Sequence, residues 1–176
     1  MKSTKHMHVV KFTVYALLLL FLYILQETPG LFVLFGSKPM PVAAFAIVVS
    51  MLEGEFVGGI FGAFAGMLCD INSPMLFGFN GLLIALFCIV TGLMVIYLMH
   101  CNAGGAALFT FTAMLFRGSV EFLFGYGMWG HEGVWRIFLQ RTLPTVIYTT
   151  AVSVLLFFPS RAVWRVFDRR LNPHRW

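Results

Sequence analysis

The sequence predicts an all-α integral membrane protein, folded as a bundle of six transmembrane helices. Of its 176 residues, 60% are hydrophobic and only 11% are charged, whereas soluble domains carry about 25% charged residues. Long apolar runs also recur from Val9 to Leu156, and a helix needs about 20 apolar residues to cross the hydrocarbon core of a bilayer. Residues 1–160 are therefore expected to form one polytopic domain.

Four of the six spans follow directly from the apolar runs. They are expected at Val9–Gln26, Gly78–Leu98, Gly104–Tyr126 and Leu143–Pro159. Residues 31–68 are harder to interpret, because Gly36–Pro39 breaks this stretch once and Glu53–Glu55 interrupts it again. Either a short helical hairpin turns at Glu53–Glu55, or a single span carries two glutamates near mid-membrane.

The distribution of basic residues favours the hairpin. Of the 12 Lys and Arg residues, three lysines flank the first span and five arginines follow the last. They are Lys2, Lys5, Lys11, Arg161, Arg165, Arg169, Arg170 and Arg175. Because cytoplasmic segments are enriched in Lys and Arg, both termini are expected in the cytoplasm, which requires an even number of spans. The hairpin supplies six spans, with the second and third short or tilted, and the single span supplies five.

A stripe of small residues precedes a carboxylate in the segment GEFVGGIFGAFAGMLCD. Its glycines recur every four residues, at Gly54, Gly58, Gly62 and Gly66. Such a stripe lets membrane helices approach backbone to backbone, so the four glycines are predicted to be helix-packing residues. Asp70 continues the spacing, and two roles are open for it: its side chain caps the turn that follows, or it contacts a partner.

Four further ionisable residues are candidates for a partner contact or a pocket. Arg117 and Glu121 are four residues apart in the fifth span and so share a helix face. Ionisable groups at that depth are costly and are candidates for function, although a mutually neutralised pair that fixes the helix orientation is the other interpretation. Glu53 and Glu55 flank the first glycine, and at a cytoplasmic turn they are expected to be solvated.

The C-terminal segment 161–176 is predicted to be a basic amphipathic tail. Trp164, Phe167 and Leu171 share one helical face, and Arg161, Arg165 and Arg169 lie on another. This pattern is typical of a helix in the cytoplasmic interface that is attracted to anionic lipid.

Motifs for catalysis or cofactor binding are absent from the sequence. It contains no glycine-rich nucleotide loop with a lysine, no HExxH and no serine in a nucleophile elbow. Cys69, Cys88 and Cys101 lack metal-ligand spacing and are expected to be structural thiols. The basic residues are explained by membrane topology, so nucleic-acid binding is not expected. The sequence therefore argues against an enzyme and indicates no metal or cofactor.

The segment GGIFGAFAGMLCDINSPMLFGFNGLL resembles the bacterial rod-shape-determining MreD family. Members of that family have glycines four apart that lead into a leucine and an aspartate, followed by a loop and a glycine that opens the next span. The matching positions here are Gly58, Gly62, Gly66, Leu68, Asp70, Gly78 and Gly81. Glu53, Glu55 and the Arg117–Glu121 pair are not part of the family pattern.

The resemblance implies a non-enzymatic scaffold in the bacterial cytoplasmic membrane. Proteins of this family pair with the single-span MreC, beside MreB, RodA and a class B penicillin-binding protein, in the elongation complex that builds lateral peptidoglycan and maintains cell shape. The resemblance also implies a fold similar to the substrate-binding S-components of energy-coupling-factor vitamin transporters, which are six-helix bundles with a central cavity.

Two other functions remain open at this stage. A vitamin-binding transporter subunit of the same fold would place Arg117 and Glu121 in its pocket. Such subunits usually carry an Ala-x-x-x-Ala pattern on the first helix, whereas VYALLLLFLYIL contains only Ala16. A small intramembrane enzyme built around Asp70 and the glutamates has no supporting motif.

The six-span topology predicts the side of the membrane on which each loop lies. A reporter fused after Leu76 should report from outside the cytoplasm, and one fused to the C-terminus should report from inside. Paired alkaline phosphatase and green fluorescent protein fusions measure both positions. A cytoplasmic signal after Leu76 would contradict the six-span arrangement.

Overall fold

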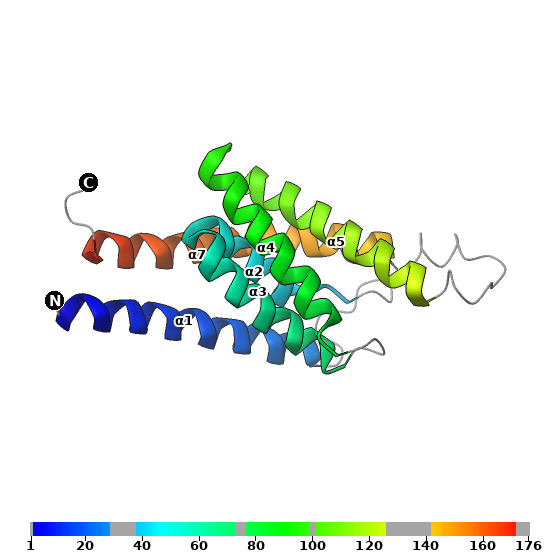
Figure 1. The fold of residues 1–176 in the computed structure, drawn as a ribbon, viewed down its shortest axis with the longest axis horizontal. Helices are drawn as coiled ribbons and strands as arrows, with labels where there is room; N and C mark the ends of the chain where they lie inside the picture. Colours follow the sequence, from blue (N-terminus) through cyan, green and yellow to red (C-terminus); the bar gives the residue numbers. More distant parts are fainter. Residues whose placement is uncertain (1, 29–37, 73–76, 99–100, 126–141, 172–176) are drawn as a thin grey trace.

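The computed structural model consists of helices, with no strand among the residues it describes, which are 2–28, 38–72, 77–98, 101–125 and 142–171. The helices are α1 (Lys2–Glu27), α2 (Pro41–Glu53), α3 (Glu55–Asp70), α4 (Phe79–Tyr97), α5 (Ala103–Gly125) and α7 (Leu143–Leu171) (Figure 1).

Four of these helices, α1, α4, α5 and α7, are long and apolar enough to cross a membrane. The other two are shorter, because α2 has 13 residues and α3 has 16. At 1.5 Å per residue they extend about 20 and 24 Å, less than the roughly 30 Å of a hydrocarbon core. The chain is therefore an all-α protein with the character of a multi-pass membrane protein.

A helical hairpin forms where the sequence left two interpretations open. Only Gly54 separates α2 from α3, and its φ of 93° lies in the left-handed region that glycine favours. Gly54, predicted to be a helix-packing residue, makes the turn and lies outside both helices, and its backbone is close to α4, because a Cβ built on Gly92 would lie 2.8 Å from the Gly54 carbonyl carbon. A Cβ built on Gly54 itself would lie 3.6 Å from the Ile96 side chain, an ordinary contact.

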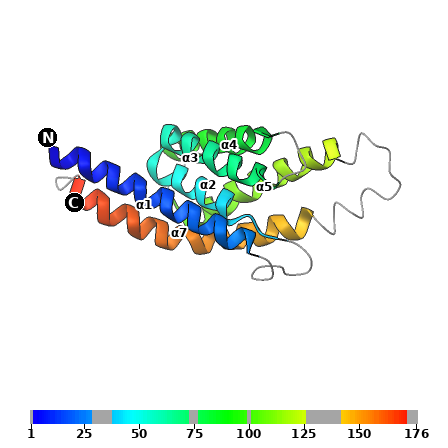
Figure 2. The same ribbon diagram turned by 90° about the horizontal axis from the view of Figure 1, so that it is seen from below.

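Helix α2 forms the centre of the bundle. It contacts all five other described helices, and every residue from Pro41 to Met51 is buried. The first turn of α1 and the last turn of α7 lie at the same end of the molecule, and these two helices run side by side (Figures 1 and 2). The helices therefore alternate in direction around a filled core.

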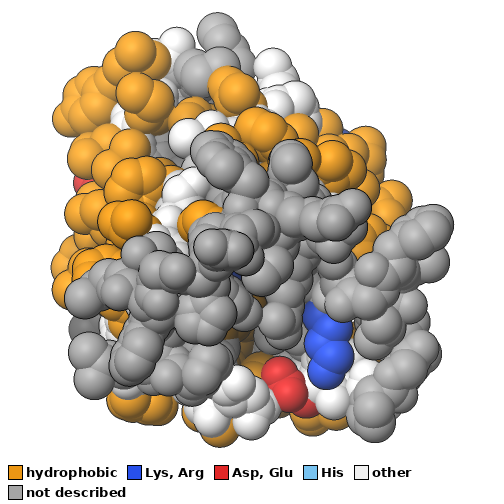
Figure 3. Space-filling model, turned by 90° about the vertical axis from the view of Figure 1, so that its right-hand side faces the viewer, with side chains coloured by type: hydrophobic (Ala, Val, Ile, Leu, Met, Phe, Trp, Pro, Cys, Tyr) orange, Lys and Arg blue, Asp and Glu red, His pale blue; other side chains and the backbone are white. Residues whose placement is uncertain are grey.

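Apolar side chains cover much of the outer surface as well. Figure 3 views the bundle from the end opposite the first turn of α1, and hydrophobic side chains predominate on the flanks that are visible there. Strongly exposed examples are Leu17, Phe21, Ile24, Phe56, Phe64, Leu82 and Leu123. Apolar surface of this extent is unusual for a soluble monomer and suits contact with lipid chains.

The glycines of α3 bring its backbone against that of α4. A Cβ on Gly62 would lie 3.0 Å from the Cα of Ala85, and a Cβ on Gly66 would overlap the backbone of Gly81. From the opposite side, a Cβ on Gly92 of α4 would lie 2.5 Å from the backbone nitrogen of Glu55. The two helices therefore touch closely from one end of α3 to the other.

The same stripe also contacts α2. A Cβ on Gly58 would overlap the side chain of Ser50, whose hydroxyl donates a buried hydrogen bond to the carbonyl of Cys88 in α4. Three helices therefore meet at Gly58, where no side chain keeps them apart. The Ser50 hydroxyl has a hydrogen-bond acceptor there although it does not contact water.

Helix α7 does not end at Pro159 as expected, but continues to Leu171. Proline lacks the N–H that would bond to the preceding turn, and next to it the Ser160 hydroxyl donates to the Leu156 carbonyl at 2.7 Å. The predicted basic tail 161–176 is thus, as far as residue 171, a continuation of the last helix, and 172–176 lie outside the described residues.

The close α3–α4 contact predicts a specific response to added volume. Gly66→Ala should destabilise the protein, because its methyl group meets backbone atoms that cannot rotate away. Overpacking costs about 1–3 kcal/mol, against a gain of about 1 kcal/mol in helix propensity. The thermal unfolding midpoint in mild detergent measures the difference.

Gly104→Ala is the matched control for this substitution. A Cβ there has no described atom within 4 Å, so the variant should be as stable as the wild type or slightly more stable. Equal stability of the two variants would contradict close packing at Gly66.

Candidate functional site

The ionisable candidates form two clusters at opposite ends of α3. We call the first the Glu53 cluster (Lys11, Tyr15 and Glu53) and the second the Asp70 cluster (Asp70, Asn80, Arg117 and Glu121). The 16 residues of α3 separate them, a distance of about 24 Å. The candidates therefore do not form one shared site.

Asp70 is buried and bonds to the beginning of α4. Its carboxylate accepts backbone N–H groups from Gly78 at 2.9 Å, Asn80 at 3.2 Å and Gly81 at 3.1 Å, and the residue is 3% exposed. The first N–H groups of a helix have no partner within the helix, and negative charge is favourable at that end. These contacts form a side-chain cap on the start of α4, the helix that follows the turn that Asp70 was predicted to cap.

Arg117 connects α5 to α4 within the same cluster. Its Nε donates to Oδ1 of Asn80 at 2.7 Å, and its Nη2 lies 3.2 Å from Oε2 of Glu121. Arg117 is 7% exposed, whereas the Glu121 side chain is 39% exposed. The Arg117–Glu121 ion pair is thus present, and an interhelical hydrogen bond that the sequence analysis did not anticipate accompanies it.

Asn80 is the residue of this cluster that sequence reasoning missed. It is 1% exposed, its backbone bonds to Asp70 and its side chain bonds to Arg117. Its Nδ2 has no hydrogen-bond partner among the described residues. The sequence feature that could have identified Asn80 is its position: it is an amide side chain in an otherwise apolar span, two residues after Gly78, the glycine that opens that span.

The Glu53 cluster joins α1 to the end of α2. The Glu53 carboxylate lies 2.5 Å from the Lys11 ammonium and accepts a hydrogen bond from the Tyr15 hydroxyl at 3.0 Å. The Lys11 and Glu53 side chains are only 5% and 10% exposed. The expectation that Glu53 is solvated is therefore wrong, and Lys11 is an interior ion-pair partner as well as a flanking charge.

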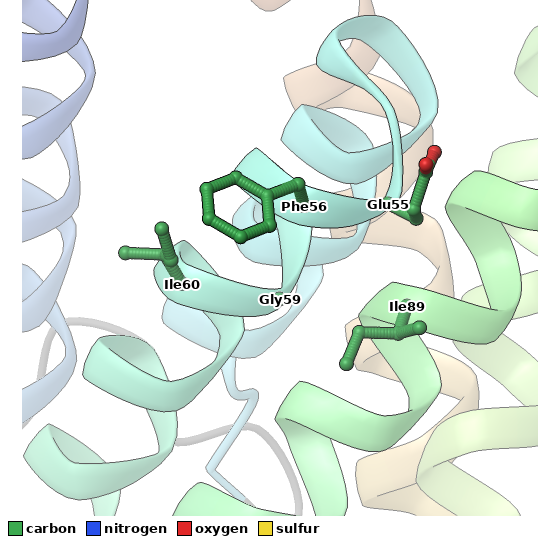
Figure 4. Close-up of a pocket in the computed structure, with 5 residues that line it drawn as sticks. All are labelled: Glu55, Phe56, Gly59, Ile60 and Ile89. Carbon is green, nitrogen blue, oxygen red and sulfur yellow. The ribbon is translucent and has the colours of Figure 1, made fainter.

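Glu55 has different surroundings from Glu53, whose carboxylate binds Lys11 and Tyr15. Glu55 is partly exposed and lies at one end of a depression of about 270 Å³ on the outer side of α3 and α4 (Figure 4). Phe56, Gly59 and Ile60 of α3 and Ile89 of α4 form the rest of the lining. This volume is below the roughly 300–1,000 Å³ of small-molecule pockets.

Within the described part of the chain, no three His, Cys, Asp or Glu side chains lie close enough to hold a metal ion. Cys69 and Cys88 are buried as free thiols, and Cys101 is a partly buried free thiol.

No family model matches the chain, and no curated protein or solved structure shows significant similarity to it.

The cap geometry of Asp70 predicts the effect of removing its carboxylate. Asp70→Ala should lower the unfolding midpoint strongly, because it leaves buried N–H groups without acceptors at about 1–3 kcal/mol each. Asp70→Asn keeps one acceptor oxygen and should show a smaller loss. Thermal unfolding of the purified full chain measures both, and wild-type stability of Asp70→Ala would favour the partner-contact role.

Proposed function

We propose that this protein is a non-enzymatic membrane scaffold of the bacterial cell-elongation complex, a protein of the MreD kind. It lies in the cytoplasmic membrane with both termini in the cytoplasm. It binds a single-span MreC-like partner and, through that partner, is part of the assembly of MreB, RodA and a class B penicillin-binding protein that makes lateral peptidoglycan.

The observation that carries this proposal is that the interior ionisable groups already bind other groups of the same chain. Glu53 pairs with Lys11, Asp70 caps α4, and Arg117 binds Asn80 and Glu121. A catalytic or substrate-binding group must be available to the substrate. Groups already engaged in contacts between helices suit a protein whose interior is structural.

The packing of α2 favours a scaffold over a vitamin-binding subunit. A carrier with a central cavity needs open volume in the middle of the bundle, whereas residues Pro41–Met51 are all buried against the surrounding helices. Arg117, the candidate pocket cation of the alternative, is 7% exposed and already bonded on two sides.

The proposed orientation has support of its own. The first turn of α1 and the last turn of α7 lie at one end of the bundle (Figures 1 and 2), as an even number of crossings requires. Basic residues are concentrated near both ends of the chain, which favours the cytoplasm for that end. In this arrangement α2 and α3 make two short crossings.

Copurification tests the scaffold function. The tagged full chain, extracted from its native membranes in mild detergent, should recover a single-span coiled-coil protein and wall-synthesis enzymes. An unrelated multi-pass protein with the same tag controls for nonspecific recovery. A tightly bound vitamin without such a partner would overturn the proposal in favour of the transporter subunit.

Glu121→Gln separates the two functions within this chain. The Glu121 side chain is 39% exposed, and the substitution keeps the hydrogen bond from Arg117 to Asn80, so the variant should still fold; its thermal unfolding midpoint is measured first to check this. A scaffold should keep its partner in this variant, whereas a subunit with Glu121 in its pocket should lose its ligand.

A further inference from the structure

A second cavity lies at the end of the bundle that contains the α2–α3 turn. It has a volume of about 350 Å³, within the range of small-molecule pockets. Three segments line it: Met51 and Leu52 at the end of α2, Cys101 and Asn102 before α5, and Arg161 and Trp164 in α7. None of these residues belongs to the Glu53 or Asp70 cluster.

Arg161 gives this cavity a positive charge that no side chain of the cavity lining neutralises. The described residues provide no ion-pair partner for it, and no acidic side chain lines the cavity. The guanidinium carbon lies 5.6 Å from the ring centroid of Phe157, which is 1% exposed. A cation–π contact of this kind positions the group and leaves its N–H donors available.

The remaining lining combines hydrogen-bond donors with apolar surface. Asn102 and the indole of Trp164 can donate hydrogen bonds, and Arg161 can bind a phosphate with two parallel bonds. Met51 and Leu52 supply an apolar wall. A tryptophan beside a cation is also typical of the depth at which lipid headgroups lie.

We propose that this cavity binds a phosphate group whose negative charge is not balanced by a cation of the same ligand, with Arg161 as its principal ligand. An anionic phospholipid headgroup and a free phosphate share this chemistry, and the apolar wall suits the glycerol and first acyl carbons of a lipid. This site is independent of the scaffold function, because it requires neither the MreC-like partner nor the wall-synthesis complex.

Thermal unfolding of the purified full chain tests the site. In an uncharged detergent the chain is titrated separately with phosphatidylglycerol, phosphatidylcholine and inorganic phosphate, because a ligand of the folded state raises the unfolding midpoint. Phosphatidylglycerol should raise the midpoint more than phosphatidylcholine. Inorganic phosphate acting alone, with the same dependence on Arg161, would identify free phosphate as the ligand.

Two arginine variants distinguish the cavity from general surface charge. Arg161→Gln should raise the half-saturating concentration at least about tenfold, as expected for the loss of hydrogen bonds to a charged group. Arg165→Gln is the matched control, since Arg165 is exposed one turn further along α7 and does not line the cavity; it should respond like the wild type.

Three outcomes would overturn the proposal: no response to any anion, an equal response to phosphatidylcholine, or equal losses in the two arginine variants. If Arg161→Gln fails to accumulate, Asn102→Ala replaces it, because Asn102 is exposed and its removal should not unfold the chain. A several-fold weaker response in Asn102→Ala supports the site, and an unchanged response contradicts it.

Discussion

The close approach of α3 to α4 is the constraint on which the other contacts of the bundle depend. In lipid, helix association gains little from the hydrophobic effect and relies on close van der Waals packing. Gly62 and Gly66 allow that packing because no side chain separates them from the α4 backbone. The contact brings Asp70 to the first N–H groups of α4, and it places Asn80 within reach of Arg117.

The two polar clusters then connect the outer helices α5 and α1 to α4 and α2 respectively. Arg117 attaches α5 to α4, and Lys11 with Tyr15 attaches α1 to the end of α2. Buried charges are unfavourable unless they are paired, and loss of one partner costs several kcal/mol, about 3–5 in measured cases. Each cluster therefore disfavours arrangements of helices that would separate its members.

Local signals in the sequence predicted the helices well, whereas the contacts between helices became known only from the structure. Apolar runs placed α4 within one residue at each end, and the distribution of basic residues favoured a hairpin at the Glu53–Glu55 interruption. The turn at Gly54 and the continuation of α7 past Pro159 depend on backbone geometry that spacing alone does not specify. Burial of Lys11 depends on where α2 ends in space, which no pattern within α1 encodes.

The residues that carry the family resemblance also have a structural explanation. Gly58, Gly62 and Gly66 pack against α2 and α4, Asp70 caps α4, and Gly78 has the positive φ of the residue before that helix. These residues therefore form the contact between α3 and α4 in this chain. Because α2 fills the centre and Glu53, Asp70 and Arg117 already bind other groups of the chain, the outer surface is the more accessible place for another molecule to bind. The apolar flanks and the Arg161 cavity lie on that surface, apart from the packed interior.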